Sequence, residues 1–519
     1  MKNIKIILLV FVLGFMSCGD DFLDQDRNGA AILSDTYYNS VTEVESATAA
    51  EYAFIDYSAW WQTVWFRAVN EAASDNAWIG LNNGDANSVF AAHYTLNSAN
   101  TRSEAHWIMQ YKAIFRFNAT IQGIEKSTID ASVKAKSIAE LKFLRAYLYF
   151  DLVNNFGDVP LLTIPLSPSD NAYPRNSKKE VFDFIKKELT DAAAVLPLKS
   201  QYSKANVFRA SKGAALTLLA KVQLYNEEWA AAITTADQVI ASNEYRLETD
   251  FNKVFEMTNY NGPESIFEIQ FQWSTLFPAL GSQHARSTAP QSQGGWGYFQ
   301  PTSDLENAFI KEGDSIRLKG TIMRHGEPVI GETAFATLDA RPANAKAGRY
   351  GRKMYVPVAQ RGAGLSSKNN IHLRYADVIL IKAEAAAMLN QGPVALAAIK
   401  LLRDRVKLTT PTGLNGQALI DRVRLERRLE LAMENNRLYD IRRWKDASGV
   451  PLINTILGPN GTFVKYNTTQ STDPFETKNL NEPQNKGFNF AAGTHNLWPI
   501  PASEIIGSDG KISQNPGYN

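Results

Sequence analysis

Cysteine is almost absent from this sequence. The chain has 519 residues and a single cysteine, Cys18, which is followed closely by the acidic residues Asp20 and Asp21. One cysteine cannot form a disulfide within the chain. The thiol must therefore be free, bonded to another chain or chemically modified.

Long apolar runs are absent as well. The run from Ile6 to Met16 is too short to span a bilayer, and no other segment reaches the required length. Because Lys2 and Lys5 precede it, this run has the form of a signal-peptide core. We therefore expect the protein to be exported.

Neither sign of charge is in excess. The chain has 54 basic and 53 acidic residues, and removal of Lys2 and Lys5 with a signal peptide leaves 52 basic residues. A protein that binds nucleic acid needs a basic surface to neutralise phosphates. This balance excludes nucleic acid as an expected partner.

Motifs of catalysis and of metal binding are missing too. The six histidines are widely spaced, and none has the spacing of a zinc site. The chain has no G-x-S-x-G elbow and no glycine loop that would hold a phosphate. We predict no catalytic residue, no metal site and no cofactor, although a glycosidase stays open because its two carboxylates can come from anywhere in a fold.

What the sequence does contain, first, is a cysteine in a distinctive setting. "FMSC", Phe15 to Cys18, resembles a bacterial lipobox, in which the cysteine sulfur receives a diacylglycerol and the chain is cleaved before it. The resemblance implies a lipid anchor at Cys18, which holds a protein on a membrane without a transmembrane helix. The alternative is an incidental cysteine in an ordinary signal peptide.

Helical periodicity dominates the remainder of the chain. Apolar residues recur at helical spacing in two similar helix pairs, separated in each case by a short turn, at 213–242 and 376–405. The segment 141–156 is apolar on two sides, so we expect a helix packed between neighbours and ended by Gly157. "SIFEIQF" alternates like a strand. Repeated helix pairs of this length predict an all-α fold of tetratricopeptide-like hairpins arranged as a superhelix.

Several tryptophans lie in polar, loop-like surroundings. Trp78 is close to Asn82, Trp273 follows the predicted strand, and Trp296 is flanked by glycines. Indole rings stack on the flat faces of sugars while amide side chains bind hydroxyl groups, so these residues are candidates for a carbohydrate site. Each of the three rings could instead belong to the core.

One segment is unusually rich in arginine. "DRVRLERRLELAMENNRLYDIRRW" looks at first like an anion site. Leu425 and Leu429 nevertheless form an apolar stripe, and Arg427 and Glu430 are three positions apart on a helix. The pattern therefore favours a solvated helix face.

Four segments together resemble the SusD/RagB family, the surface lipoproteins of starch-utilisation-type systems in Bacteroidetes. The segments are "LRAYLYFDLVNNFGDVPLL" (144–162), "LRYADVILIKAEA" (373–385), "ERRLELAMENNRLYDIRRW" (426–444) and "LWPIPASEI" with "QNPGY" (497–518). With the lipoprotein start, the resemblance extends over essentially the whole chain.

The resemblance implies a binding protein without catalysis. Such a protein captures an oligosaccharide at the cell surface and passes it to a SusC-type TonB-dependent transporter of the outer membrane, with Asp20 and Asp21 as an export signal. The stacking positions of the family match Trp78, with Asn82 beside it, and Trp296, and a third is expected between Trp273 and Gln283. Some members of the RagB type serve peptide uptake instead.

The expected organisation follows from these features. Residues 1–17 are the lipoprotein signal peptide, 18–40 a lipidated flexible tether, and 41–519 one SusD-like domain. Within that domain we expect a helical scaffold at about 41–264 and 371–450. A loop-rich ligand-binding insertion occupies about 265–370, and the C-terminal segment 451–519 is irregular.

Overall fold

The computed structural model describes residues 37–56, 63–80, 85–166, 173–276, 281–324, 347–362, 365–474 and 476–518. Cys18 and Asn82 lie outside these ranges. The first described helix begins at Val41, where the Ser40 hydroxyl accepts a hydrogen bond from the Glu43 N–H and the Glu43 carboxylate accepts one from the Ser40 N–H. This reciprocal capping satisfies two backbone donors and begins the helix at that point.

Most of the described chain is helical, as predicted. The helices before the insertion are α3 (Val41–Glu51), α4 (Thr63–Ala73), α5 (Ala86–Ala92), α6 (Thr101–Lys126), α7 (Ala131–Phe156), α8 (Lys178–Val195), α9 (Lys212–Tyr225) and α10 (Trp229–Ala241). Those after it are α14 (Tyr375–Met388), α15 (Gly392–Arg405), α16 (Gly416–Glu430), α17 (Arg437–Arg443), α18 (Leu452–Ile456), α19 (Thr462–Lys465), α20 (Lys486–Asn489) and α21 (Ala502–Gly507). Among the described residues, no helix has both the length and the apolar character needed to cross a membrane.

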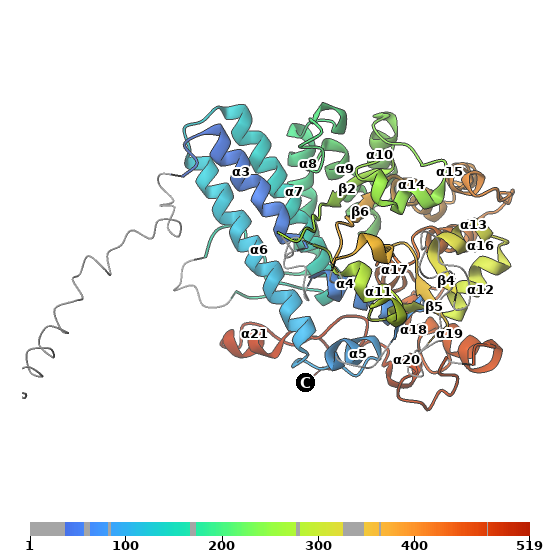
Figure 1. Ribbon diagram of the computed structural model, residues 1–519. Helices are drawn as coiled ribbons and strands as arrows, with labels where there is room; N and C mark the ends of the chain where they lie inside the picture. The colour runs from blue at the N-terminus through green and yellow to red at the C-terminus, as the bar shows by residue number, and fades with distance from the viewer. Residues whose placement is uncertain are drawn as a thin grey trace, which may run out of the picture.

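The helices pack as a succession of neighbours. α6 packs on α7, α7 on α8, α8 on α9, α9 on α10, α10 on α14, and α14 on α15, and they follow one another across the molecule in Figure 1. Both predicted helix pairs are present, as α9–α10 and α14–α15. The all-α expectation with tetratricopeptide-like hairpins is therefore confirmed.

Helix α7 lies between neighbours, as its two apolar sides predict. Asp130 caps its first turn, and Gly157, with a φ of 75°, ends it. Phe143, Leu144 and Leu148 are fully buried. A left-handed backbone is accessible to glycine without a steric penalty, so Gly157 stops the helix where the sequence indicates.

Three two-stranded antiparallel sheets frame the insertion. β2 (Ser265–Ile269) pairs with β6 (Asn370–Arg374), β1 (Ala77–Gly80) with β3 (Tyr298–Pro301), and β4 (Ile322–Arg324) with β5 (Arg349–Gly351). The strand predicted in "SIFEIQF" is β2. The chain thus enters the insertion through one strand of a sheet and leaves it through the partner strand.

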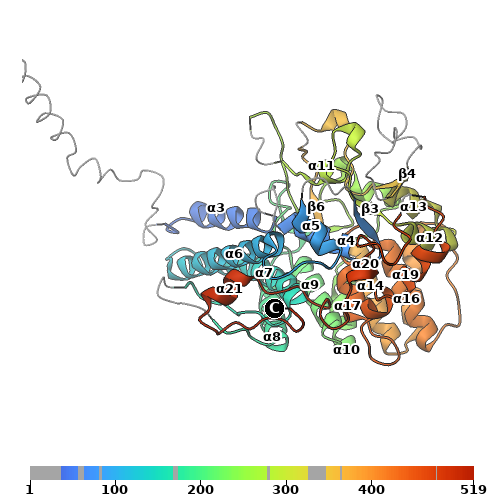
Figure 2. The ribbon, with the colours of Figure 1, turned by 90° about the horizontal axis from the view of Figure 1, so that it is seen from below.

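The insertion is less irregular than the sequence indicates. It contains α11 (His284–Thr288), α12 (Ser303–Lys311) and α13 (Ser315–Thr321). Because these helices have only five to nine residues, they complete too few turns to show a helical period. Figure 2 shows α11 and β6 on one side of the scaffold, with α8 and α10 on the opposite side.

The arginine-rich segment is not a solvated helix face, and that prediction was wrong. Arg427 and Glu430 of α16 are fully buried. Arg427 binds Asp440, with Nε and Oδ2 2.8 Å apart, and Asp377, with Nη1 and Oδ1 2.6 Å apart. Because α16 packs against α12, α14 and α15, its charged side chains face other elements rather than water.

Candidate functional site

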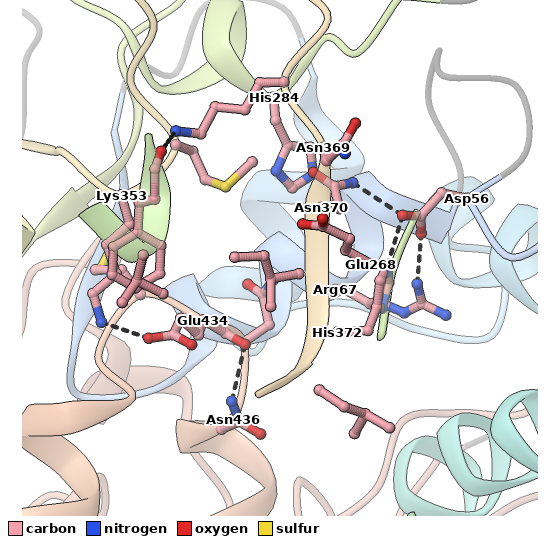
Figure 3. A pocket seen from close by; sticks show the side chains of 18 of the residues that line it. Asp56, Arg67, Glu268, His284, Lys353, Asn369, Asn370, His372, Glu434 and Asn436 are labelled. Carbon is pink, nitrogen blue, oxygen red and sulfur yellow. Dashed lines mark hydrogen bonds and ion pairs between the residues drawn. The ribbon is translucent and has the colours of Figure 1, made fainter. Parts of the chain in front are cut away.

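A polar cavity lies beneath the insertion, beside the β2–β6 sheet. Its volume is about 110 Å³. Arg67 of α4, Tyr147 of α7, His284 of α11, and Asn370 and His372 of β6 belong to its lining. Figure 3 shows Arg67, His284, Asn370 and His372, which come from segments far apart in the sequence, around this pocket.

One wall is organised around the carboxylate of Asp56. Arg67 Nη1 donates to Oδ1 at 2.7 Å, and Asn370 Nδ2 donates to Oδ2 at 3.0 Å. His372 Nε2 lies 2.8 Å from the same Oδ2, and its Nδ1 lies 2.7 Å from the Tyr147 hydroxyl. Burial alone would raise the pKa of Asp56, but the His372 and Arg67 charges outweigh it and hold that pKa well below its usual range.

The other lining groups keep hydrogen-bonding capacity. Burial raises the pKa of Glu268 to about 7, although the Asn261 N–H donates to its carboxylate. Burial lowers the pKa of His284 to about 4, so its imidazole is neutral at pH 7 and has one donor and one acceptor nitrogen. Asn370 is 6% exposed, and its Oδ1 accepts no hydrogen bond from any described residue.

These groups suit a polar ligand that both donates and accepts hydrogen bonds. A buried acceptor without a partner is costly, and a ligand hydroxyl within reach would satisfy it. Aromatic residues, among them Phe255, Tyr260 and Tyr439, complete the lining. An apolar surface with a few placed polar groups is the usual composition of a small-molecule site.

Trp78 is not part of this cavity, and the interpretation of it as a stacking platform was wrong. The side chain is 2% exposed in β1, and its ring centroid lies 5.6 Å from that of Phe463. The indole Nε1 donates to Glu476 Oε1 at 3.2 Å. A ring enclosed in this way has no face left for a sugar. Asn82, its predicted neighbour, lies outside the described residues.

Trp273 lies on the loop that follows β2 and is half-buried. Its backbone N–H donates to Ser367 Oγ at 2.9 Å, and the segment from Ser367 continues into Asn369 and Asn370 of the cavity. A Cβ added to Gly362 would overlap its indole. The glycine therefore lets the backbone approach the ring and fixes Trp273 next to the cavity wall.

Trp296 is also half-buried and contacts α11. Its backbone N–H donates to the Arg286 carbonyl at 2.8 Å, and the Arg286 guanidinium carbon lies 4.9 Å from the ring centroid. α11 thus has His284 at the cavity and Arg286 at Trp296. Trp273 thus contacts a segment that continues into the cavity lining, and Trp296 contacts α11, but the residues that line the cavity include neither.

Sequence reasoning missed the residues that line the cavity itself. Asp56 and His372 are 316 positions apart, so no local motif contains both. Histidine spacing in a sequence indicates only whether a metal site is present. Two of the six, His284 and His372, line the cavity, and their scarcity is the one signal that could have drawn attention to them.

Comparison with known proteins agrees with a binding protein built on helical hairpins. A family model described as "SusD family" matches residues 258–518, and one described as "Starch-binding associating with outer membrane" matches 21–224. The chain belongs to the SusD family, as its sequence motifs indicate.

Individual relatives are distant but match nearly the whole chain. A SusD-like protein P2 of Formosa agariphila is 27% identical over 100% of both chains. The crystal structure of a SusD-like protein from Bacteroides fragilis has a TM-score of 0.76 at 25% identity and covers 93% of this chain and 98% of its own. A laminarin-binding SusD-like protein has a TM-score of 0.75 at 24% identity, covering 93% of this chain and 100% of its own.

Proposed function

We propose that this protein is a lipid-anchored lipoprotein of the outer membrane that captures an oligosaccharide at the cell surface and delivers it to a SusC-type TonB-dependent transporter. The observation that carries the proposal is the cavity beneath the insertion, with its unsatisfied Asn370 Oδ1, and we infer that Trp273 and Trp296 of the insertion contact the ligand. The laminarin-binding and surface glycan-binding names of structures with the same fold support a glycan as ligand.

Binding without catalysis fits the chemistry of the cavity. Hydrolysis of a glycoside needs one protonated carboxyl and one free carboxylate. Glu268 has the raised pKa of an acid, but Asp56, Asp151 and Glu434 are bound by cationic side chains. Among the described lining residues this leaves Glu256 as the carboxylate without an ion pair. Incubation of the protein with its best-bound glycan is expected to return the glycan intact, and released product would contradict this.

The ligand class is tested with the mature protein purified in detergent. We expect it to bind oligosaccharides on an array that holds both glycans and peptides. Exclusive binding of peptides would favour the alternative of a peptide-uptake protein and would overturn the glycan proposal.

The site is tested by single substitutions. An aromatic contact contributes about 0.5–1.5 kcal/mol, so Trp273→Ala and Trp296→Ala should each weaken glycan binding by roughly three- to tenfold in titration calorimetry. Trp229→Ala is the matched control, because Trp229 is a half-buried indole at the start of α10, outside the insertion. Unchanged affinity in both insertion variants would place the ligand elsewhere.

The anchor and the transporter are tested in cells. Mass spectrometry of the mature protein should find acyl chains on Cys18, and Cys18→Ala should remain unlipidated and uncleaved. Solubilisation of the outer membrane and purification of the protein should also recover a TonB-dependent transporter. A free thiol at Cys18 in the mature protein would exclude the lipid anchor.

A further inference from the structure

A second cavity adjoins the first. Its volume is about 250 Å³, and it shares four lining residues with the first cavity, Phe255, Glu256, Lys353 and Lys368. These four residues therefore form a common wall between two spaces. A ligand longer than one sugar ring would contact this wall wherever it passes from one space to the other.

Lys368 is the unusual member of the common wall. It is 5% exposed, and its ammonium donates to the carbonyl of Phe255. Within the described ranges, no carboxylate lies within 4.0 Å of its Nζ. Buried ammonium groups are normally paired with a carboxylate, because an uncompensated buried charge is costly.

Two other buried lysines of the first cavity show the usual arrangement. Lys353 Nζ lies 2.6 Å from Glu434 Oε1, and Lys221 Nζ lies 3.0 Å from Asp377 Oδ2. Both lysines are as deeply buried as Lys368. The missing counter-ion is therefore a property of Lys368 and not of lysines in this part of the fold.

The second cavity has an excess of positive charge. Its lining includes Arg352, Lys353 and Lys368, and because Glu434 already pairs with Lys353, two cations are left against one carboxylate, that of Glu256. Arg352 Nη1 donates to the Lys319 carbonyl at 2.8 Å, which supplies no negative charge. Burial lowers the pKa of Lys368 to about 8 because it outweighs the attraction of Glu256 and Glu268, and the nearby Arg352 charge acts in the same direction as burial. An anion at this wall would compensate both cations.

We propose that the common wall binds an anionic substituent, a carboxylate or a sulfate ester, of an oligosaccharide that spans the two cavities. Lys368 pairs with the anion in the place of a protein carboxylate, and Arg352 lies beside it in the second cavity. This inference rests on the proposed glycan-binding function and narrows the ligand to acidic glycans. Lys368 is then the residue that selects acidic over neutral chains.

The first experiment compares ligand classes on one array with the mature protein. The array holds neutral oligosaccharides, uronate-containing oligosaccharides and sulfated oligosaccharides. We expect the bound set to be acidic and its binding to weaken with added salt. Binding of neutral glycans alone would overturn the inference and leave the proposed function intact. Binding of no glycan would overturn both.

The second experiment identifies the anion and the residue. The best-bound oligosaccharide is treated in two ways: its carboxylates are reduced to alcohols, or its sulfate groups are removed. The treatment that eliminates the bound anion should abolish binding, and the other treatment should not. Lys368→Met should weaken binding of the unmodified oligosaccharide by about tenfold or more, since it removes one partner of a buried charge pair. Lys368→Arg should retain most of the affinity.

The controls separate recognition from folding. Lys400→Met removes a lysine from the exposed Lys400–Asp404 pair of α15 and should leave binding unchanged. If Lys368→Met does not fold, Arg352→Met serves instead, with an expected loss of about threefold because Arg352 is less buried. If wild type and the folded variant bind the acidic oligosaccharide with equal affinity, the common wall does not bind its anionic group.

Discussion

Two charged regions of the molecule are both buried, yet they differ in what their charges bind. The first is the ion-pair network around α16, in which Arg317, Arg374 and Arg405 surround Glu430. The second is the cavity beneath the insertion. In the network the charges are matched within the chain, whereas the cavity leaves Asn370 Oδ1 and the Lys368 ammonium without matching groups.

The pKa of Glu430 shows the same contrast. Burial alone would raise the pKa of its carboxyl, but Arg405, Arg374 and Arg317 together hold that pKa well below its ordinary value. The opposite holds for Glu268 in the cavity, whose pKa burial raises to about 7. Burial of charge alone therefore does not identify a binding site, because a buried charge can be matched by opposite charges within the chain, as at Glu430.

The two regions meet at Glu434. Its carboxylate accepts from Arg374 Nε at 2.7 Å and from Lys353 Nζ at 2.6 Å, and both Glu434 and Lys353 line the cavity. The network thus supplies one rigid wall of the site. Figure 3 shows the contact of Lys353 with Glu434 across that wall.

The largest expected effect comes from breaking the network. Arg374→Met removes the shared partner of Glu264, Glu430 and Glu434 and leaves buried carboxylates undercompensated. We expect the free energy of unfolding to fall by about 3–5 kcal/mol in urea denaturation. Lys400→Met, in an exposed pair, should change it by less than about 0.5 kcal/mol. A loss no larger than this control would mean that the network does not stabilise the fold.

A smaller effect is expected at Trp78, which tests the difference between core and site tryptophans. Trp78→Phe keeps an aromatic ring but removes the hydrogen bond to the buried Glu476 carboxylate. The free energy of unfolding should fall by about 1–3 kcal/mol, while glycan affinity stays within about twofold of wild type. Trp273→Ala should show the reverse pattern, with affinity lost and stability kept. Weaker glycan binding by Trp78→Phe with an unchanged free energy of unfolding would show that Trp78 belongs to the binding site.

The scaffold could be predicted from the sequence because its signals are local. The α9–α10 and α14–α15 hairpins repeat apolar residues at helical spacing, and β2 alternates over its own length. Gly157 ends α7 by its own backbone conformation. None of these features depends on a residue far along the chain.

The site could not be predicted in the same way because its contacts are distant. Trp78 has polar neighbours in sequence, yet Phe463 and Glu476 of the C-terminal segment contact its ring and enclose it. Arg427 appears to have a partner three positions away in Glu430, but tertiary packing brings Asp377 and Asp440 to it. Which buried charge lacks a partner is visible only when all elements are in place.

The smallest effect concerns Lys486, a buried lysine that the fold holds beside Trp78. Its Nζ donates to the carbonyls of Ser74 and Ala77 and lies 5.0 Å from the Trp78 ring centroid. Burial lowers its pKa from 10.5 to about 7, against the attraction of Asp75. A neutral amine still has two hydrogens for the two carbonyls, so both hydrogen bonds survive deprotonation.

The sign of the pH dependence follows from this shift. Between about pH 7 and pH 10 the unfolded chain binds the proton of Lys486 more often than the folded chain does, so stability rises with pH in this window. Lys486→Met removes that contribution. We therefore expect the free energy of unfolding of wild type, relative to that of the variant, to increase by up to about 1.4 kcal/mol per pH unit between about pH 7 and pH 9. Denaturation at several pH values measures this difference. A difference that stays constant with pH would mean that the buried Lys486 ammonium keeps its charge.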